Sequence, residues 1–117
     1  MSTNKSTIEK YIDGFNKSDH AQILSCLTDD VEWVMPGNFH LKGKVEFDGE
    51  IENDAFTGRP IVKLMRMIEE NNVVIAEGTV QGSFKNGDKL NARFCDVFEM
   101  RDALINRLIT YLIVLPE

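Results

Sequence analysis

The chain has 117 residues, of which 43% are hydrophobic and 27% are charged. These values are typical of a globular protein with one moderate core, and they predict a single domain over residues 1–117. The formal net charge of −6 argues against a nucleic-acid partner, because phosphate binding needs a basic surface.

The first third of the chain is predicted to be helical. Ser6 and Glu9 have the spacing of a capping box, and apolar residues then recur at helical intervals as far as Phe15. After a short break, Asp19 followed by Gln22 provides a second cap. The pattern therefore predicts two consecutive helices.

The middle of the chain is harder to interpret. A short strand is predicted from Val31 to Met35, where Pro36 and the following glycine end it. The stretch from Asn38 to Thr57 has no clear period, although apolar residues after Gly43 suggest a short helix.

The last half of the chain is predicted to consist of consecutive strands. They span Pro60–Glu70, Val73–Phe84, Lys89–Arg101 and Leu104–Leu115. The connecting segments are short, and the one at Asp102 and Ala103 is the weakest turn, because it has no glycine or asparagine to adopt a positive φ. Helices followed by hairpin-linked strands predict an α+β domain, in which helices pack on the concave face of a curved antiparallel sheet.

The composition of the segments also predicts the compartment. Residues 1–5 are polar and lack the apolar run of a signal peptide, and the most apolar segment, Leu104–Leu115, is too short to span a bilayer. Cys26 and Cys95 do not make a disulfide framework and are expected to be buried free thiols. We therefore expect a cytoplasmic protein without a membrane partner.

Asp96 is the most informative residue of the predicted strands. Alternation places it on the apolar face of its strand, between Phe94 and Phe98. An ionised carboxylate there is costly unless it has a partner, keeps its proton or faces a wet cavity, and each of these shifts its pKa. Two interpretations remain open: a buried structural carboxylate, or an acid in a functional pocket.

The chain resembles the nuclear transport factor 2-like superfamily, which includes SnoaL-like polyketide cyclases and ketosteroid isomerase-like proteins. The residues that carry the resemblance are, in order, Tyr11, Ile12, Ser18, Asp19, Asp29, Asp30 and Pro36, then Cys95, Asp96 and Val97, and finally Tyr111. The resemblance implies a cone-shaped α+β fold whose sheet, mixed at its edge, encloses an apolar pocket with the helices.

The resemblance also implies roles for two residues. Tyr11 and Asp96 fall on the positions of a tyrosine and a protonated aspartic acid that donate hydrogen bonds to a developing enolate oxygen. The isomerases carry a general-base aspartate just before the proline, whereas this chain has Met35, whose thioether cannot act as a base. Asp48, Glu50 or an ionised Asp96 are the alternatives for that role.

Further residues are candidates for ligand binding. The set is Phe15, Trp33, Met35, His40, Phe94 and Phe98. Most of them are equally explained as core, and His40 lies either at the pocket mouth or on the surface. We predict no metal and no cofactor, because the two histidines are far apart and lack a carboxylate at ligand spacing.

The leading functional hypothesis is a small-molecule pocket protein. As an enzyme it would perform acid/base chemistry, such as isomerisation, cyclisation or dehydration, on a lipophilic carbonyl compound. The alternatives are a non-catalytic binding module for a hydrophobic ligand and a protein-interaction domain.

We also expect a homodimer, because the alternate faces of the last strands are more apolar than a solvated sheet face. The residues of those faces are Cys95, Val97, Ile105, Ile109, Tyr111, Ile113 and Leu115.

Overall fold

The computed structural model describes residues 3–51 and 60–116. Its elements in chain order are α1 (Thr3–Lys17), α2 (His20–Leu24), β1 (Leu27–Met35), β2 (Phe39–Lys42), α3 (Gly43–Ile51), β3 (Ile61–Glu70), β4 (Val73–Ser83), β5 (Lys89–Arg101) and β6 (Leu104–Val114). Among the described residues, no helix is both long enough and apolar enough to cross a membrane.

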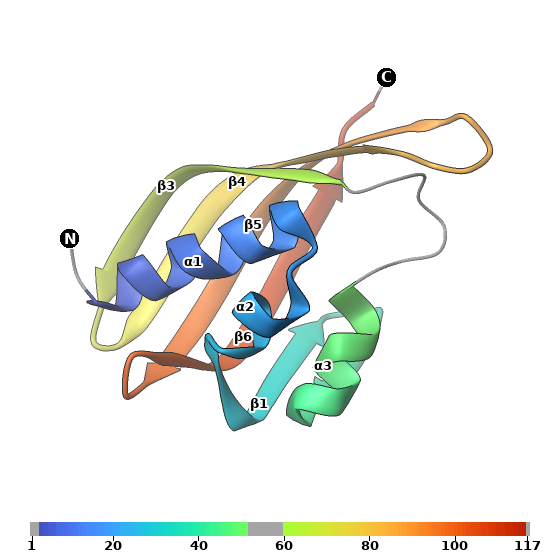
Figure 1. Cartoon of the computed structure of the whole chain (residues 1–117). Coiled ribbons are helices and arrows are strands. Elements are labelled where there is room, and N and C mark those ends of the chain that lie inside the picture. The colour runs from blue at the N-terminus through green and yellow to red at the C-terminus, as the bar shows by residue number, and fades with distance from the viewer. Residues whose placement is uncertain (1–2, 52–59, 117) are drawn as a thin grey trace.

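The strands form one curved sheet with the helices on one of its faces (Figure 1). The strand order is β2-β1-β6-β5-β4-β3, and every neighbouring pair is antiparallel except β1 and β6, which are parallel. The predicted α+β class, with a sheet that is mixed towards one edge and helices packed on its inner face, is confirmed.

The hairpins of β3 to β6 follow the predicted strands closely. Asn71 and Asn72 both have positive φ, as expected for a two-residue hairpin turn. Asp102 and Ala103 also have positive φ, at 53° and 61°, although neither is the glycine or asparagine that such a turn favours. The alanine is the less favourable of the two: both residues carry a Cβ that crowds the following carbonyl group, but only aspartate has a short polar side chain that can hydrogen-bond locally in this conformation.

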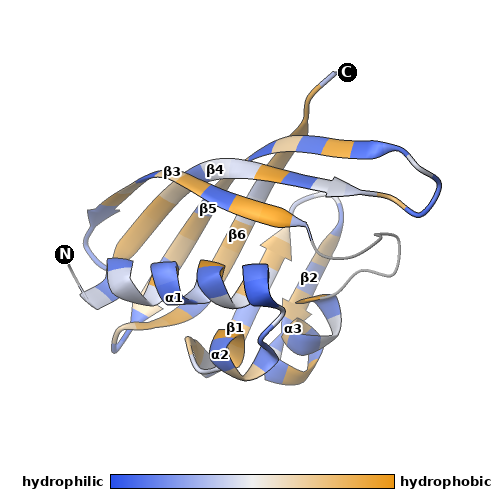
Figure 2. Cartoon of the chain, turned by 45° about the horizontal axis from the view of Figure 1, so that its top comes forward, coloured by the Kyte–Doolittle hydropathy of each residue, from blue (hydrophilic) through white to orange (hydrophobic). Residues whose placement is uncertain are grey.

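The inner face of the sheet and the apolar side of α1 form the core. Figure 2 shows hydrophobic residues along the strands behind α1, while α1 itself carries both hydrophilic and hydrophobic residues. On β5, alternate residues from Leu90 to Met100 are buried, as the sequence pattern predicts for the face that contains Asp96. Gly14 lets α1 and α2 approach, because a Cβ there would lie 2.8 Å from Cγ1 of Ile23.

One of two predicted helix caps in the N-terminal half was wrong. The first helix does not begin at a Ser6 cap, because Ser6 lies inside α1. The buried Asn4 side chain donates hydrogen bonds to Glu69 and Asn72, and these contacts tie the earlier helical turn to the β3–β4 hairpin. The second cap is confirmed, since the Asp19 carboxylate accepts from the Gln22 N–H at 3.0 Å.

The middle segment contains both an expected and an unexpected element. The short helix after Gly43 is confirmed as α3, whereas strand β2 was not predicted. β2 is an edge strand of four residues that pairs only with β1, so its sequence is too short for a clear alternating pattern. Residues 52–57, the rest of the segment without a predicted period, lie outside the described residues.

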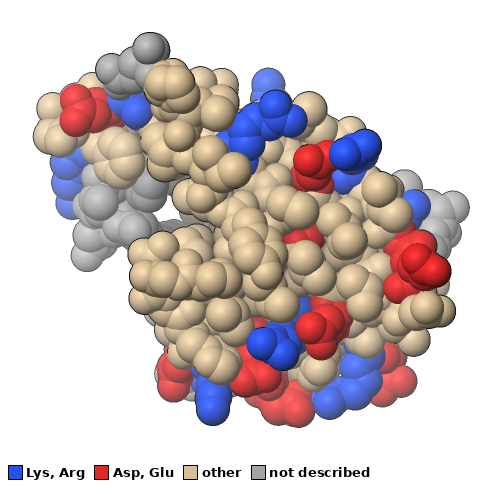
Figure 3. Space-filling view, turned by 180° about the vertical axis from the view of Figure 1, so that it is seen from behind, with Lys and Arg blue, Asp and Glu red and all other residues tan. Residues whose placement is uncertain are grey.

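The outer face of the sheet is partly apolar. Figure 3 shows uncharged side chains across its middle and charged groups around them. The exposed hydrophobic residues of this face are Ile61, Ile68, Ile75, Tyr111 and Ile113.

Two residues differ from their predicted burial. Ile105 was expected on the outer face, but it is fully buried, because the register of β5 and β6 shifts between Glu99 and Met100. Cys26 is buried as predicted, whereas Cys95 is partly exposed on the outer face.

Candidate active site

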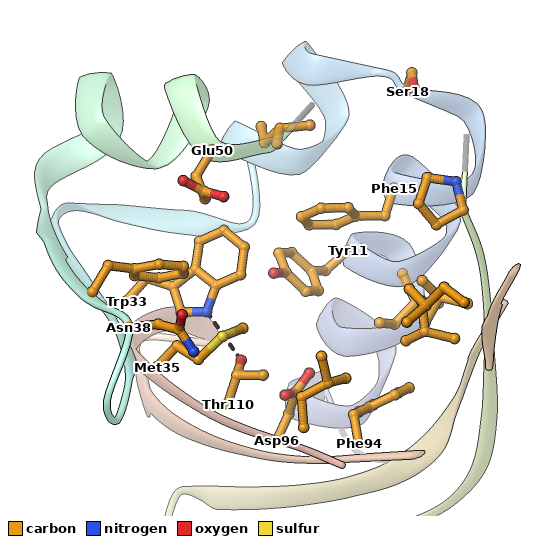
Figure 4. A pocket seen from close by; sticks show the side chains of 18 of the residues that line it. Tyr11, Phe15, Ser18, Trp33, Met35, Asn38, Glu50, Phe94, Asp96 and Thr110 are labelled. Carbon is orange, nitrogen blue, oxygen red and sulfur yellow. Dashed lines mark hydrogen bonds between the residues drawn. The ribbon is translucent and has the colours of Figure 1, made fainter. Parts of the chain in front are cut away.

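A cavity of about 830 Å³ lies between the sheet, α1 and α3 (Figure 4). This volume is in the range of sites that bind organic molecules of drug size. Its apolar lining residues are Tyr11, Ile12, Phe15, Trp33, Met35, Phe39, Ile51, Pro60, Val62, Val80, Leu90, Phe94 and Leu112. The polar lining residues are Ser18, Asn38, Glu50, Lys85, Asp96 and Thr110.

Trp33 is held in one wall by three aromatic rings and one hydrogen bond. Its indole stacks on Phe47 with ring centroids 4.6 Å apart and meets Phe15 and Phe39 edge to face. The indole Nε1 donates to the Thr110 hydroxyl at 3.0 Å, and this bond is fully buried. Each aromatic pair contributes about 0.5–1.5 kcal/mol beyond its buried area, so the ring has a well-defined position.

Asp96 lies on the cavity floor and points into the cavity (Figure 4). It is only 8% exposed, and within the described part of the chain its Oδ1 has no hydrogen-bond partner. Burial raises the pKa of this carboxyl group from 3.8 to about 7, against a smaller opposing effect of the hydrogen bond from Thr110. Both protonation states are therefore populated near neutral pH.

Tyr11 reaches the cavity from α1, and its hydroxyl end points into the open space (Figure 4). The ring packs edge to face against Phe15 and Phe98, with centroids 5.0 Å and 5.6 Å away. Burial, and then the negative charge of Asp96, raise the pKa of Tyr11 well above its ordinary value of 10.0. The phenol therefore stays protonated at neutral pH and is available as a hydrogen-bond donor.

The structure separates the two alternative general bases. Glu50 on α3 lines the cavity, and Figure 4 shows it on the side opposite Asp96. Asp48 does not line the cavity, and its carboxylate bonds Nδ1 of His20 at 2.6 Å. Met35 lines the cavity at the position where the resemblance implies the aspartate.

Four of the six candidate ligand-binding residues reach the cavity: Phe15, Trp33, Met35 and Phe94. Phe98 does not, because it is fully buried beneath Tyr11. His40 also lies outside, because the alternation of β2 turns it outward, where its Nε2 is 3.0 Å from a carboxylate oxygen of Glu32.

Thr110 and Lys85 are cavity residues that the sequence analysis missed. Thr110 could have been found, because alternation on β6 places it between Leu108 and Leu112 on the inner face. Lys85 belongs to the β4–β5 connection, and nothing in the sequence indicates where that loop lies. In residues 3–51 and 60–116, no group of three or more His, Cys, Asp or Glu side chains has an arrangement suited to a metal ion.

The family model of the SnoaL-like domain matches residues 8–108. The chain belongs to the SnoaL-like domain family. This match covers most of the chain.

Solved structures share this SnoaL-like fold at low sequence identity. The crystal structure of TerC co-crystallised with polyporic acid has a TM-score of 0.87 and 23% identity, over 96% of this chain and 92% of TerC. A nuclear transport factor 2-like protein of unknown function from Burkholderia pseudomallei K96243 has a TM-score of 0.88 and 18% identity, over 97% of this chain and 92% of that one.

A protein from Xanthomonas campestris pv. campestris, proposed to be a polyketide cyclase, has a TM-score of 0.85 and 21% identity. The alignment covers 93% of this chain and 89% of that one. A search of curated proteins finds no match. These likenesses establish the fold but not the reaction.

Proposed function

We propose that this SnoaL-like protein is an enzyme that performs acid/base chemistry on a lipophilic carbonyl compound bound in the cavity. The observation that carries the proposal is Asp96, a buried acid with a pKa of about 7 that shares an apolar cavity with the Tyr11 hydroxyl. A carboxyl group with this pKa is partly protonated at neutral pH and largely protonated below it, and in that form it can donate a hydrogen bond to a substrate oxygen. Membership of the SnoaL-like family supports a small-molecule substrate.

The proposed chemistry begins at the carbonyl oxygen of the substrate. Tyr11 and protonated Asp96 donate hydrogen bonds to this oxygen and stabilise the negative charge that develops on it. A base removes a proton from the neighbouring carbon, and the C–H electrons form the carbon–carbon double bond of an enolate. In a substrate with a carbon–carbon double bond next to that carbon, return of the proton to the far end of the resulting dienolate completes an isomerisation. Attack of the enolate carbon on an electrophile within the same molecule instead completes a cyclisation.

Glu50 is the proposed base. It lines the cavity on the side opposite Asp96, so a bound ligand would lie between the two carboxyl groups. This arrangement assigns proton removal to Glu50 and oxygen stabilisation to Asp96 and Tyr11. It also compensates for Met35, which cannot accept a proton.

The test is deuterium incorporation into a panel of lipophilic ketones, followed by proton NMR in D₂O. The protein is expected to speed exchange at the carbon next to the carbonyl, and Asp96→Asn is expected to slow this exchange while the fold is retained, because an amide is a weaker hydrogen-bond donor than a carboxylic acid. Asp102→Asn is the matched control, because Asp102 lies in an exposed turn at positive φ, where asparagine is well tolerated. Undiminished exchange in the Asp96→Asn variant would rule out the proposed role.

A non-catalytic binding module is the second candidate, and Met35 in the cavity wall favours it. Trp33 is the single tryptophan of the chain and lines the cavity, so intrinsic fluorescence reports binding directly. Polyporic acid is a suitable first ligand, since TerC shares the fold and was co-crystallised with it. A binding module would keep its affinity in an Asp96→Leu variant and would show no deuterium exchange.

We further propose that two copies pair through the outer face of the sheet. Ile75, Tyr111 and Ile113 expose 38%, 50% and 66% of their surface there, and burial of such side chains favours association. Light scattering at micromolar concentration is expected to give the mass of a dimer, and Ile113→Glu to give a monomer. A wild-type monomer under these conditions would contradict the pairing.

A further inference from the structure

Thr110 lies between the aromatic wall of the cavity and its acid (Figure 4). Its hydroxyl oxygen accepts the 3.0 Å hydrogen bond from the Trp33 indole. Because an indole N–H can only donate, this bond fixes Thr110 as the acceptor in the pair. The hydroxyl proton of Thr110 is therefore free to be donated elsewhere.

Asp96 is the acidic residue that the sheet places opposite Thr110. Thr110 and Asp96 are directly opposed residues of β6 and β5 and share the inner face. Opposed side chains of an antiparallel pair have Cβ atoms about 5 Å apart, which is within reach of a hydroxyl and a carboxylate. The hydrogen bond from Thr110 opposes the effect of burial and lowers the pKa of Asp96, as donation to the ionised carboxylate should.

We infer that Thr110 is a positioning residue for Asp96, and that the Trp33 indole fixes the direction in which Thr110 donates. The three side chains form a row that crosses β1, β6 and β5: Trp33 is hydrogen-bonded to Thr110, and Thr110 is the residue directly opposed to Asp96. This role rests on the proposed acid/base function. The titration of Asp96 tests it without a substrate.

The other groups near Asp96 do not hide the effect of the Thr110 hydroxyl on the pKa of Asp96. α1 contributes the neutral Tyr11, and β4 places Ala76, which carries no charge, directly opposite Asp96. Glu50 and Lys85 line the same cavity. Burial raises the pKa of Asp96 and the Thr110 hydroxyl lowers it, so removing the hydroxyl removes a group that favours the ionised form.

The experiment follows the carboxyl carbon of Asp96 by NMR in protein labelled with ¹³C-aspartate. The resonance is assigned by its loss in the Asp96→Asn variant. In Thr110→Val, which keeps the branched shape without the hydroxyl, the titration midpoint should rise by about half a pH unit or more. Thr110→Ser should restore the wild-type midpoint, and the matched control Thr79→Val, on the outer face of β4, should leave it unchanged.

Trp33→Phe provides an independent variant, because it keeps an aromatic ring and removes the N–H donor of the row. Its midpoint should rise by less than that of Thr110→Val, since the hydroxyl remains but is no longer directed. An unchanged or lower midpoint in folded Thr110→Val, or in Trp33→Phe if the valine variant does not fold, would overturn the inference. If the wild-type protein does not speed deuterium exchange, the proposed function is contradicted, but the result of this titration still stands.

Discussion

Replacing Asp96 with asparagine is expected to change how the stability of the protein depends on pH. The folded state keeps the Asp96 proton up to a pKa of about 7, whereas the unfolded chain releases it above about 3.8. Between these values the folded state binds more protons, so the free energy of unfolding falls as the pH rises. The stabilisation from this group is complete below 3.8, and its loss is nearly complete above 7.

The size of the effect follows from the two pKa values. They differ by about three pKa units, and at about 1.4 kcal/mol per unit the buried carboxylate costs about 4 kcal/mol at high pH. Between pH 5 and pH 8, the expected loss is about 2.5 kcal/mol. Asparagine has nearly the same shape and cannot ionise, so the variant lacks this part of the pH dependence.

Urea unfolding at several pH values, followed by the fluorescence of Trp33, measures the difference. Subtracting the free energy of unfolding of the variant from that of the wild type cancels the contributions of the other titrating groups. Asp102→Asn serves as the control for loss of a surface charge. The asparagine variant should become progressively more stable than the wild type as the pH rises to 8. Parallel curves for the two proteins over this range would refute the buried, proton-retaining state of Asp96.

Three further predictions concern the framework of the site. Gly78→Ala should prevent folding or lower the free energy of unfolding by several kcal/mol in a urea titration, because a Cβ there would lie 2.6 Å from the Phe94 ring and closer still to backbone. Wild-type stability of this variant would contradict the packing. Ala103→Gly should raise the stability by about 1 kcal/mol in thermal unfolding, because it relieves a φ of 61°, and a lower Tm would count against the turn geometry. Asn4→Ala should lower the free energy of unfolding by about 1–3 kcal/mol, since Glu69 loses a partner. Hydrogen exchange should also speed up at the start of α1, and unchanged exchange rates there would argue against the role of this contact.

The sequence predicted the side of the sheet on which the acid lies, and the physical reason is simple. Alternation along β5 is uninterrupted, so each residue from Leu90 to Met100 keeps the face that its position predicts. Ile105 shows where the same reasoning fails, because a shift of register reverses the face and leaves no mark in the sequence. Alternation along β6 also places Thr110 on the inner face. Its pairing with Asp96 could not be predicted, because it depends on which residues of the two strands are opposed.

The other side chains that line the cavity were harder to predict than Asp96 on its floor. Tyr11 and Asp96 were paired by resemblance, whereas Glu50, Asn38 and Lys85 come from segments without a readable period. Both positions stayed open for His40, at the pocket mouth or on the surface, because the edge strand β2 that turns it outward is too short to be recognised. Side chains in such segments acquire their positions from tertiary packing, which local pattern does not encode.

The central claim is that the cavity binds a lipophilic carbonyl compound with its oxygen at Tyr11 and Asp96. The most direct measurement is a crystal structure of the protein with the ketone that exchanges deuterium fastest. The carbonyl oxygen is expected to lie within hydrogen-bond distance of the Tyr11 hydroxyl and the Asp96 carboxyl, with Glu50 on the far side of the ligand. A ligand bound outside the cavity, or one whose carbonyl points away from both donors, would contradict it.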